Sequence, residues 1–290
     1  MTVGGLSGAF VVVGYALREA LRRRVFAVVV VLTIAFLVLY WLGAREAFDD
    51  TSGFAAEEDG IVDTKAFTGA TIFGLAMFAT LFLGIVLTIF LTLSVVRGDA
   101  ERGLLQPLVV RPLGRASLLL ARWAGATAVS SVYVILVYFA TLLITRSAGD
   151  WTPDHIVGPA LALAGGVAVV AALSLLGSIF LSTTANGIAV FMLFGAGLTA
   201  GLLGSIGNAL GNETLEDVAQ VTAWALPFEA LYQAGLSALV SETTGLTGVI
   251  LQLGPFGVAR DASLALIPWT VAYLAIVLAL AVVAFGRRDL

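Results

Sequence analysis

VRGDAERGLLQPLVVRPLGRASLLLARW, residues 96–123, is a basic and amphipathic stretch between two long uncharged apolar segments, and it holds five of the chain's arginines. Pro112 cannot continue a helix and disfavours the helical conformation at Arg111, so two short helices at an angle are predicted. The first of them carries an apolar ridge of Leu104, Leu105 and Leu108. A ridge too short to cross a membrane can either lie on lipid or dock into a groove of another protein.

The composition around this stretch is that of an integral membrane protein. Of the 290 residues, 60% are hydrophobic and 12% charged, with a mean hydropathy of +1.04. Uncharged apolar runs long enough to cross a bilayer predict an all-α, polytopic fold with six transmembrane helices in a single domain, residues 1–290. The predicted spans cover about 25–43, 69–96, 124–145, 157–182, 187–207 and 263–286.

The distribution of charge predicts the orientation of these spans. With both termini and residues 97–123 on one side, that side receives 11 of the 15 basic residues and four acidic ones, and the other side receives the remaining 15 acids. Cytoplasmic loops of membrane proteins are rich in Lys and Arg. The sequence therefore predicts a multi-pass protein of the cell membrane with both termini in the cytoplasm and an acidic external loop over residues 45–68.

Two further segments have helical periodicity. From Phe10 onward, apolar residues recur at helical spacing and charged, mostly basic residues form the opposite face. This pattern predicts an N-terminal interfacial helix. The alternative is an extension of the first span. In the external segment 208–262, Thr214 and Asp217 resemble a capping box. After Pro227 an apolar stripe faces away from Glu229, Gln233 and Ser237, so helices at the membrane surface, or partly dipping into it, are expected before the last span.

The predicted fourth and fifth spans are rich in glycine. Gly197 and Gly201 are four residues apart, the small-xxx-small spacing that lets helix backbones approach closely in lipid. A helix-packing face is the default interpretation of this pair. A face that lines a translocation path or a dimer interface is the more specific one.

Several functional classes are disfavoured by what the sequence lacks. The predicted spans contain no Asp, Glu, Lys, Arg or His, whereas ion-driven carriers usually keep such groups in the membrane. The sequence has no Walker A motif, no HExxH zinc motif, no GxSxG elbow and no cysteine, so no cofactor, metal site or catalytic residue is predicted. The single histidine, His155, lies next to Asp154 in a short polar loop, where a solvated turn residue is expected.

ERGLLQPLVVRPLGRASLLLARW, residues 101–123, resembles the signature of ABC type-2 transporter permeases: an acidic residue and a glycine, a Leu-rich helix, an Arg-Pro turn and a basic segment that returns to the membrane. In relatives a lysine is common at the end of this motif. Here Arg122 is near that position and provides the same positive charge. The N-terminal helix and WALPFEALYQ, residues 224–233, also resemble the family. Two short segments look most like permeases of nitrous-oxide-reductase maturation systems: the end of the first span, Trp41 to Gly43, and the turn from Pro112 to Arg115.

The resemblance implies a function and partners. The chain would be the membrane-spanning permease subunit of an ABC exporter, without enzymatic activity of its own, working with a second permease copy or paralogue and two ATPase subunits. The expected ATPase-coupling positions are Asp99, Glu101, Arg102, Gly103, Leu104, Leu105, Leu108, Arg111, Pro112 and Arg115. The second and fifth spans would line the path. The alternatives are a non-transporting scaffold or sensor that binds a cytoplasmic partner, and an ion-coupled secondary carrier.

Overall fold

The fold was analysed in a computed structural model, which describes residues 24–54, 63–92, 115–239, 241 and 263–287. Throughout these residues the regular structure is helical. The eight helices of the described residues are α2 (Arg24–Phe54), α3 (Thr64–Thr92), α5 (Arg115–Gly149), α6 (Val157–Phe180), α7 (Thr183–Leu210), α8 (Glu213–Ala225), α9 (Pro227–Ser237) and α11 (Leu266–Gly286).

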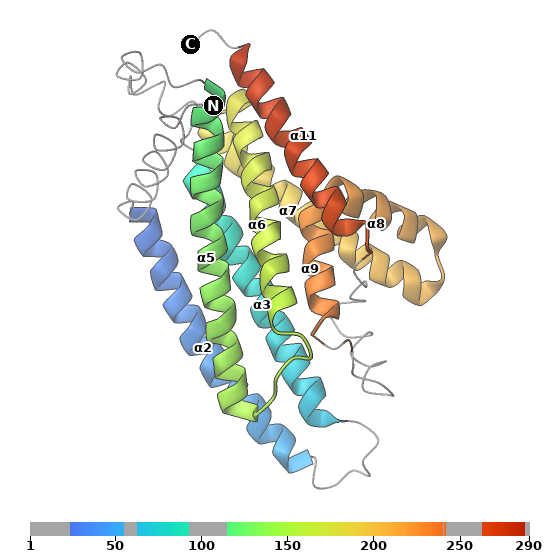
Figure 1. Cartoon of the computed structure of the whole chain (residues 1–290). Helices are drawn as coiled ribbons and strands as arrows, with labels where there is room; N and C mark the ends of the chain where they lie inside the picture. Colours follow the sequence, from blue (N-terminus) through green and yellow to red (C-terminus); the bar gives the residue numbers. More distant parts are fainter. Residues whose placement is uncertain (1–23, 55–62, 93–114, 240, 242–262, 288–290) are drawn as a thin grey trace.

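The long helices run side by side, and their ends define two ends of the bundle (Figure 1). At one end α5 begins at Arg115 and α11 ends next to Arg287, and we call it the basic end. At the opposite end α2 stops and α3 starts, and we call it the acidic end. Leu119, Leu175 and Phe285 pack in one apolar cluster, which brings α5, α6 and α11 together at the basic end.

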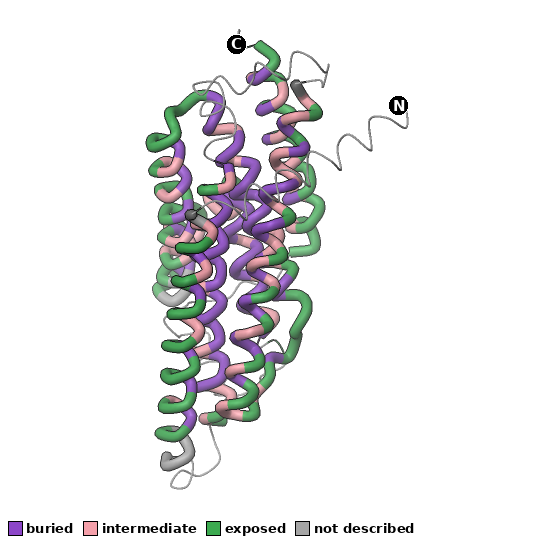
Figure 2. Tube along the Cα trace, turned by 90° about the vertical axis from the view of Figure 1, so that its left-hand side faces the viewer, coloured by how far each residue is buried: buried purple, intermediate pink, exposed green. Residues whose placement is uncertain are grey.

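The centre of the bundle is formed by α3 and α6. In their most apolar 18-residue stretches, α3 and α6 are 67% and 61% buried, whereas α2 is 17% buried and α7 and α11 are each 28% buried. Figure 2 shows the same division, with buried residues along the middle and exposed ones along the outer helices. The outer helices therefore leave broad apolar faces for lipid or for another protein chain.

Two buried threonines of α3 hydrogen-bond to the backbone of their own helix. Thr80 Oγ1 donates to the Ala76 carbonyl at 2.7 Å, and Thr88 Oγ1 donates to the Gly84 carbonyl at 2.7 Å. Both threonines are fully buried. Such bonds to the carbonyl four residues earlier let a polar side chain sit in a membrane helix without an unpaired group.

The six predicted spans are confirmed as six helices long and apolar enough to cross a membrane, and several of these helices extend beyond the predicted bounds of the spans. Helix α2 continues to Phe54, into the predicted acidic loop, and α5 begins at Arg115 and runs to Gly149. Contacts between these two helices explain the extension: Tyr40 Oη and Thr145 Oγ1 lie 2.5 Å apart, and the Phe48 ring lies against Gly149. Helix α7 begins at Thr183, four residues before the predicted start of the fifth span.

Helices α8 and α9 confirm that the segment before the last span is helical, and of the two expected placements α9 agrees with the one that dips inward. Gly235 of α9 packs on Pro159 and Ala162 near the start of α6, and Phe228 packs on Gly166 farther along it. Gly166 is nine residues into α6, so α9 enters the bundle by about 14 Å at 1.5 Å per residue. The backbone NH of His155 donates to the Ala238 carbonyl at 3.2 Å, which holds the other end of α9 at the acidic end.

The start of α8 also differs from the predicted capping box. The N-cap residue is Asn212, whose side-chain oxygen accepts a hydrogen bond from the Leu215 NH at 3.2 Å. Thr214 is instead inside the first turn of the helix. Asn is among the preferred N-cap residues, so the element was predicted correctly and its first residue was not.

Candidate functional site

The predicted ATPase-coupling residues fall mostly outside the described part of the chain. Nine of them, Asp99 to Pro112, lie in the gap between α3 and α5, and Arg115 is the first residue of α5. The flanking positions are described: α3 ends at Thr92, and α5 begins at the basic end of the bundle (Figure 1). The predicted N-terminal interfacial helix also lies outside the described residues.

A buried polar cluster joins three helices next to the end of α3. Thr92 Oγ1 of α3 lies 2.6 Å from Ser174 Oγ of α6. Asn186 of α7 donates from Nδ2 to the Ser174 carbonyl at 2.9 Å, and all three residues are at most 1% exposed. Breaking one of these hydrogen bonds is unfavourable, because the surrounding apolar side chains offer few other partners for the polar groups. The cluster therefore connects the last described turn of α3 to α6 and α7.

We expect Asn186→Ala to lower the stability of the bundle by about 0.5–2 kcal/mol, because it removes the polar contact between α6 and α7. The measurement is the thermal unfolding midpoint of the detergent-solubilised protein. Thr199→Ala is the matched control, because Thr199 is on the same helix, is exposed and bonds to the Gly195 carbonyl of its own helix. Equal midpoints for the two variants would contradict a structural role for Asn186.

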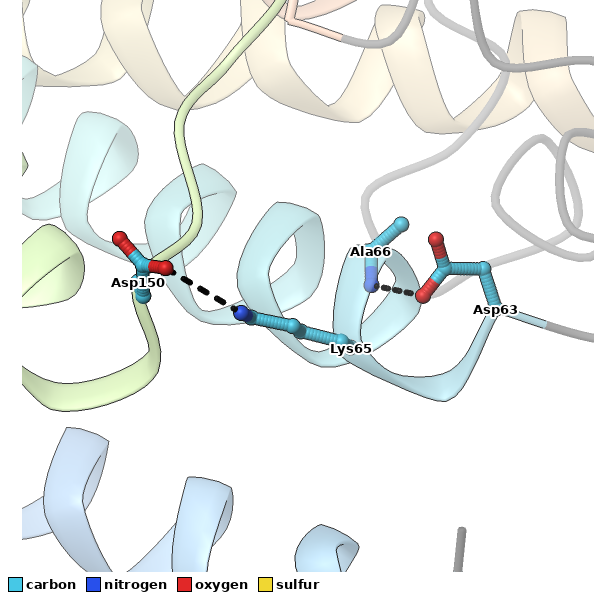
Figure 3. A network of polar contacts seen from close by, with 4 residues as sticks. All are labelled: Asp63, Lys65, Ala66 and Asp150. Carbon is cyan, nitrogen blue, oxygen red and sulfur yellow. Dashed lines mark hydrogen bonds and ion pairs between the residues drawn. The ribbon is translucent and has the colours of Figure 1, made fainter.

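At the acidic end, the described polar contacts are exposed (Figure 3). Asp63 Oδ1 accepts from the Ala66 NH at 2.9 Å and so caps the start of α3. Lys65 Nζ lies 3.9 Å from Asp150 Oδ2, with the two side chains 52% and 91% exposed. Exposed pairs of this kind contribute at most about 1 kcal/mol. These contacts arrange the ends of helices and form no enclosed site.

The two glycines predicted for close helix packing both face α9. A side chain at Gly197 would meet the Phe228 ring at 2.7 Å, and one at Gly201 would overlap the carboxyl group of Glu229 and meet Gln233 Nε2 at 2.9 Å. Both positions are therefore used for packing within the chain, which is the default interpretation of the pair. The partner is a short helix of the predicted external segment, which sequence spacing alone does not identify.

The polar face of α9 is buried in the bundle. Glu229 is 4% and Gln233 is 9% exposed, and Gln233 Nε2 donates to Glu229 Oε1 at 2.9 Å. Burial and, second, the nearby Glu229 raise the pKa of the Tyr232 hydroxyl above its usual range, so that it stays protonated. The sequence pattern does not predict the buried carboxyl group of Glu229, because α9 is shorter than a membrane span.

Helices α3 and α7 share an aromatic contact. The Phe82 ring of α3 lies 6.4 Å from the Phe191 ring and 6.2 Å from the Phe194 ring of α7, measured between centroids. Phe82 is 40% exposed, and α7 carries exposed apolar residues along its length: Ile188, Met192, Leu193, Leu202 and Ile206. The two helices thus present neighbouring apolar surface that the other described residues do not cover.

These features define a polytopic α-helical membrane protein with six candidate spans, a short buried helix before the last one and no group of three or more metal-ligating residues among the described positions. Residues 11–290 match the family described as ABC-2 family transporter protein, and the chain belongs to that family. It is therefore a membrane subunit of an ABC transporter. A comparison with curated proteins gives no match.

Proposed function

We propose that this chain is the permease subunit of an ATP-driven exporter and that it couples to separate ATPase subunits through residues 97–123. The family match over residues 11–290 is the observation that carries this proposal. ABC transporters of this family generally contain an ATPase partner. The sequence contains no Walker A motif, which agrees with ATP hydrolysis on another polypeptide.

The described helices support a route for coupling. The proposed coupling residues connect Thr92, at the end of α3, with Arg115, at the start of α5. Because Thr92 contacts Ser174, and Asn186 bonds to the same residue, a displacement of the end of α3 would be shared by α6 and α7. Closure of the ATPase subunits would then shift a connected group of helices, as in the rigid-body transitions of other switching proteins.

The neighbouring apolar surfaces of α3 and α7 support a translocation path completed by a second permease copy or paralogue. Phe82 and the exposed residues of α7 lie on the outside of the single chain. An exposed apolar face formed by several neighbouring residues marks lipid contact or a protein interface. Two copies facing each other through α3 and α7 would enclose a path between them, above two ATPase subunits.

The proposed orientation puts the basic end in the cytoplasm and the acidic end outside the cell membrane. Single cysteines are a clean probe because the natural chain has none. Ser117 and Ser147 are both exposed and lie near opposite ends of the same helix, α5. We expect a membrane-impermeant maleimide to label Ser147→Cys in intact cells and Ser117→Cys after permeabilisation. Labelling of Ser117→Cys in intact cells would reverse the topology.

The experiment that tests the function is purification of the tagged chain from its native membrane, followed by identification of the proteins that remain bound. The proposal predicts a polypeptide with a Walker A motif in the purified assembly. A partner without nucleotide-binding sequences would favour the scaffold or sensor, and transport by the chain alone on a proton gradient would favour the secondary carrier.

A further inference from the structure

A cavity of about 440 Å³ lies where α8, α9 and the start of α11 meet. Its acidic and amide side chains are Glu216, Gln220, Glu229 and Gln233. Its apolar wall includes Trp224, Leu266 and Trp269. As far as the described residues show it, the lining contains no Lys, Arg or His. The cavity is thus rich in acceptors of hydrogen bonds on one side and aromatic on the other.

The side-chain oxygen of Gln233 in this lining has no hydrogen-bond partner among the described residues. Gln233 Nε2 donates to Glu229 Oε1 at 2.9 Å, and this orients the amide so that Gln233 Oε1 is the free acceptor. Gln233 is 9% exposed, so water in bulk does not satisfy this oxygen. A buried acceptor without a donor is energetically unfavourable, and a bound donor group would remove that cost.

The aromatic wall is held in place by its own contacts. Trp269 Nε1 donates to the Trp224 carbonyl at 2.9 Å, and the two rings are 5.5 Å apart with an angle of 69° between their planes. Indole faces attract cations as well as apolar groups. A side chain at Gly201 of α7 would overlap the carboxyl group of Glu229, so the backbone of α7 passes close to that carboxyl group.

From this juxtaposition we infer that the cavity binds a primary ammonium group attached to an apolar body. The ammonium N–H groups would donate to Gln233 Oε1 and to the carboxyl oxygens of Glu229 and Glu216, and the apolar body would lie on Trp224 and Trp269. An anion would be repelled by the two carboxyl groups. A bare metal ion is disfavoured by the size of the cavity and by the absence of a third acidic or His ligand among its described lining residues.

The inference goes beyond the proposed function, because it concerns binding and stands whether or not the chain couples to an ATPase. The probe is 1-adamantylammonium, and the matched neutral compound is 1-adamantanol. Binding to the full chain in phosphatidylcholine nanodiscs is measured by quenching of tryptophan fluorescence. We expect saturable binding of the ammonium compound at least about tenfold tighter than that of the alcohol, because a hydrogen bond to a charged group is stronger than a neutral one.

Variants separate the site from partitioning into lipid. Glu229→Gln and Gln233→Leu should each weaken binding of the probe about tenfold or more, and Glu216→Gln, at the half-buried rim, should weaken it severalfold without disturbing the core. Glu213→Gln is the control, because Glu213 precedes Glu216 on α8 by one turn, is exposed and does not line the cavity. Equal affinities for all folded variants, or no saturation, would overturn the inference, and Glu216→Gln decides it if the buried variants do not fold.

The same ammonium chemistry exists in free amines and in the ethanolamine headgroup of lipids. Repeating the titration in nanodiscs that contain phosphatidylethanolamine distinguishes these sources. Weaker apparent binding of the probe there would show that the lipid headgroup competes for the cavity. Unchanged binding would assign the site to free amines.

Discussion

The variant Leu104→Ala with Leu108→Ala should lose its ATPase partner during purification. If these leucines fill a groove on the ATPase, each is an interface anchor, and truncation of such an anchor costs about 2 kcal/mol or more. Two such losses, about 4 kcal/mol together, would weaken the affinity by about a thousandfold, since each 1.4 kcal/mol is about tenfold. The measurement is the amount of ATPase recovered with the tagged chain, together with the ATP hydrolysis of the recovered assembly.

The matched control is Leu136→Ala with Leu143→Ala, because both residues are more than 60% exposed on α5 and lie in its membrane span. It makes the same chemical change away from residues 97–123 and should retain the partner. Glu101→Ala should weaken coupling more than assembly, because a charge near a helix start contributes about 0.3–1 kcal/mol. A double variant at Leu104 and Leu108 that is folded and keeps both partner and hydrolysis would show that these residues are a lipid-facing connector.

The second large effect is expected for Gly201→Val. A side chain at this position would overlap the Glu229 carboxyl group and press on Gln233, both of which belong to the buried face of α9. Overpacking of this kind costs about 1–3 kcal/mol, because well-packed side chains and backbone must shift. We expect a lower thermal unfolding midpoint for the solubilised protein and a smaller yield of monodisperse material.

Gly195→Val provides the control for this change. Gly195 is on α7 as well, and a side chain added there meets no other heavy atom within 4 Å. The substitution should leave the midpoint unchanged or raise it slightly, because glycine is a poor helix former. If both variants unfolded at the same temperature, the close approach of α7 to α9 would not be a determinant of stability.

Local features of the sequence predicted most of the fold. The six spans, the two helices before the last span and the close packing at Gly197 and Gly201 are all present in the described residues. These features depend on local properties: the number of consecutive apolar residues, helical periodicity and the absence of side chains at two positions. Each can be evaluated from neighbouring residues without knowledge of the tertiary structure.

The burial of α9 could not be predicted in the same way. Its periodicity is that of a surface helix, with Glu229 and Gln233 opposite the apolar stripe, and its length is less than that of a membrane span. Both faces are covered because α6 contacts one of them through Gly165 and Gly166, and α7 contacts the other through Gly201. Which helices surround an element is a tertiary property, and the small residues that permit it are distant in the sequence. The same reason explains why the cavity next to Gln233 was not predicted.

The most direct test of the proposal that this chain transports by using a separate ATPase is the ATP hydrolysis of the assembly purified through a tag on the chain. The same preparation, stripped of its partners by high salt and mild denaturant and then refolded in lipid, serves as the comparison. The account predicts vanadate-sensitive hydrolysis by the assembly, none by the chain alone, and recovery of activity when the partner is added back. An assembly that hydrolyses no ATP, or a chain that hydrolyses it without a partner, would contradict the account.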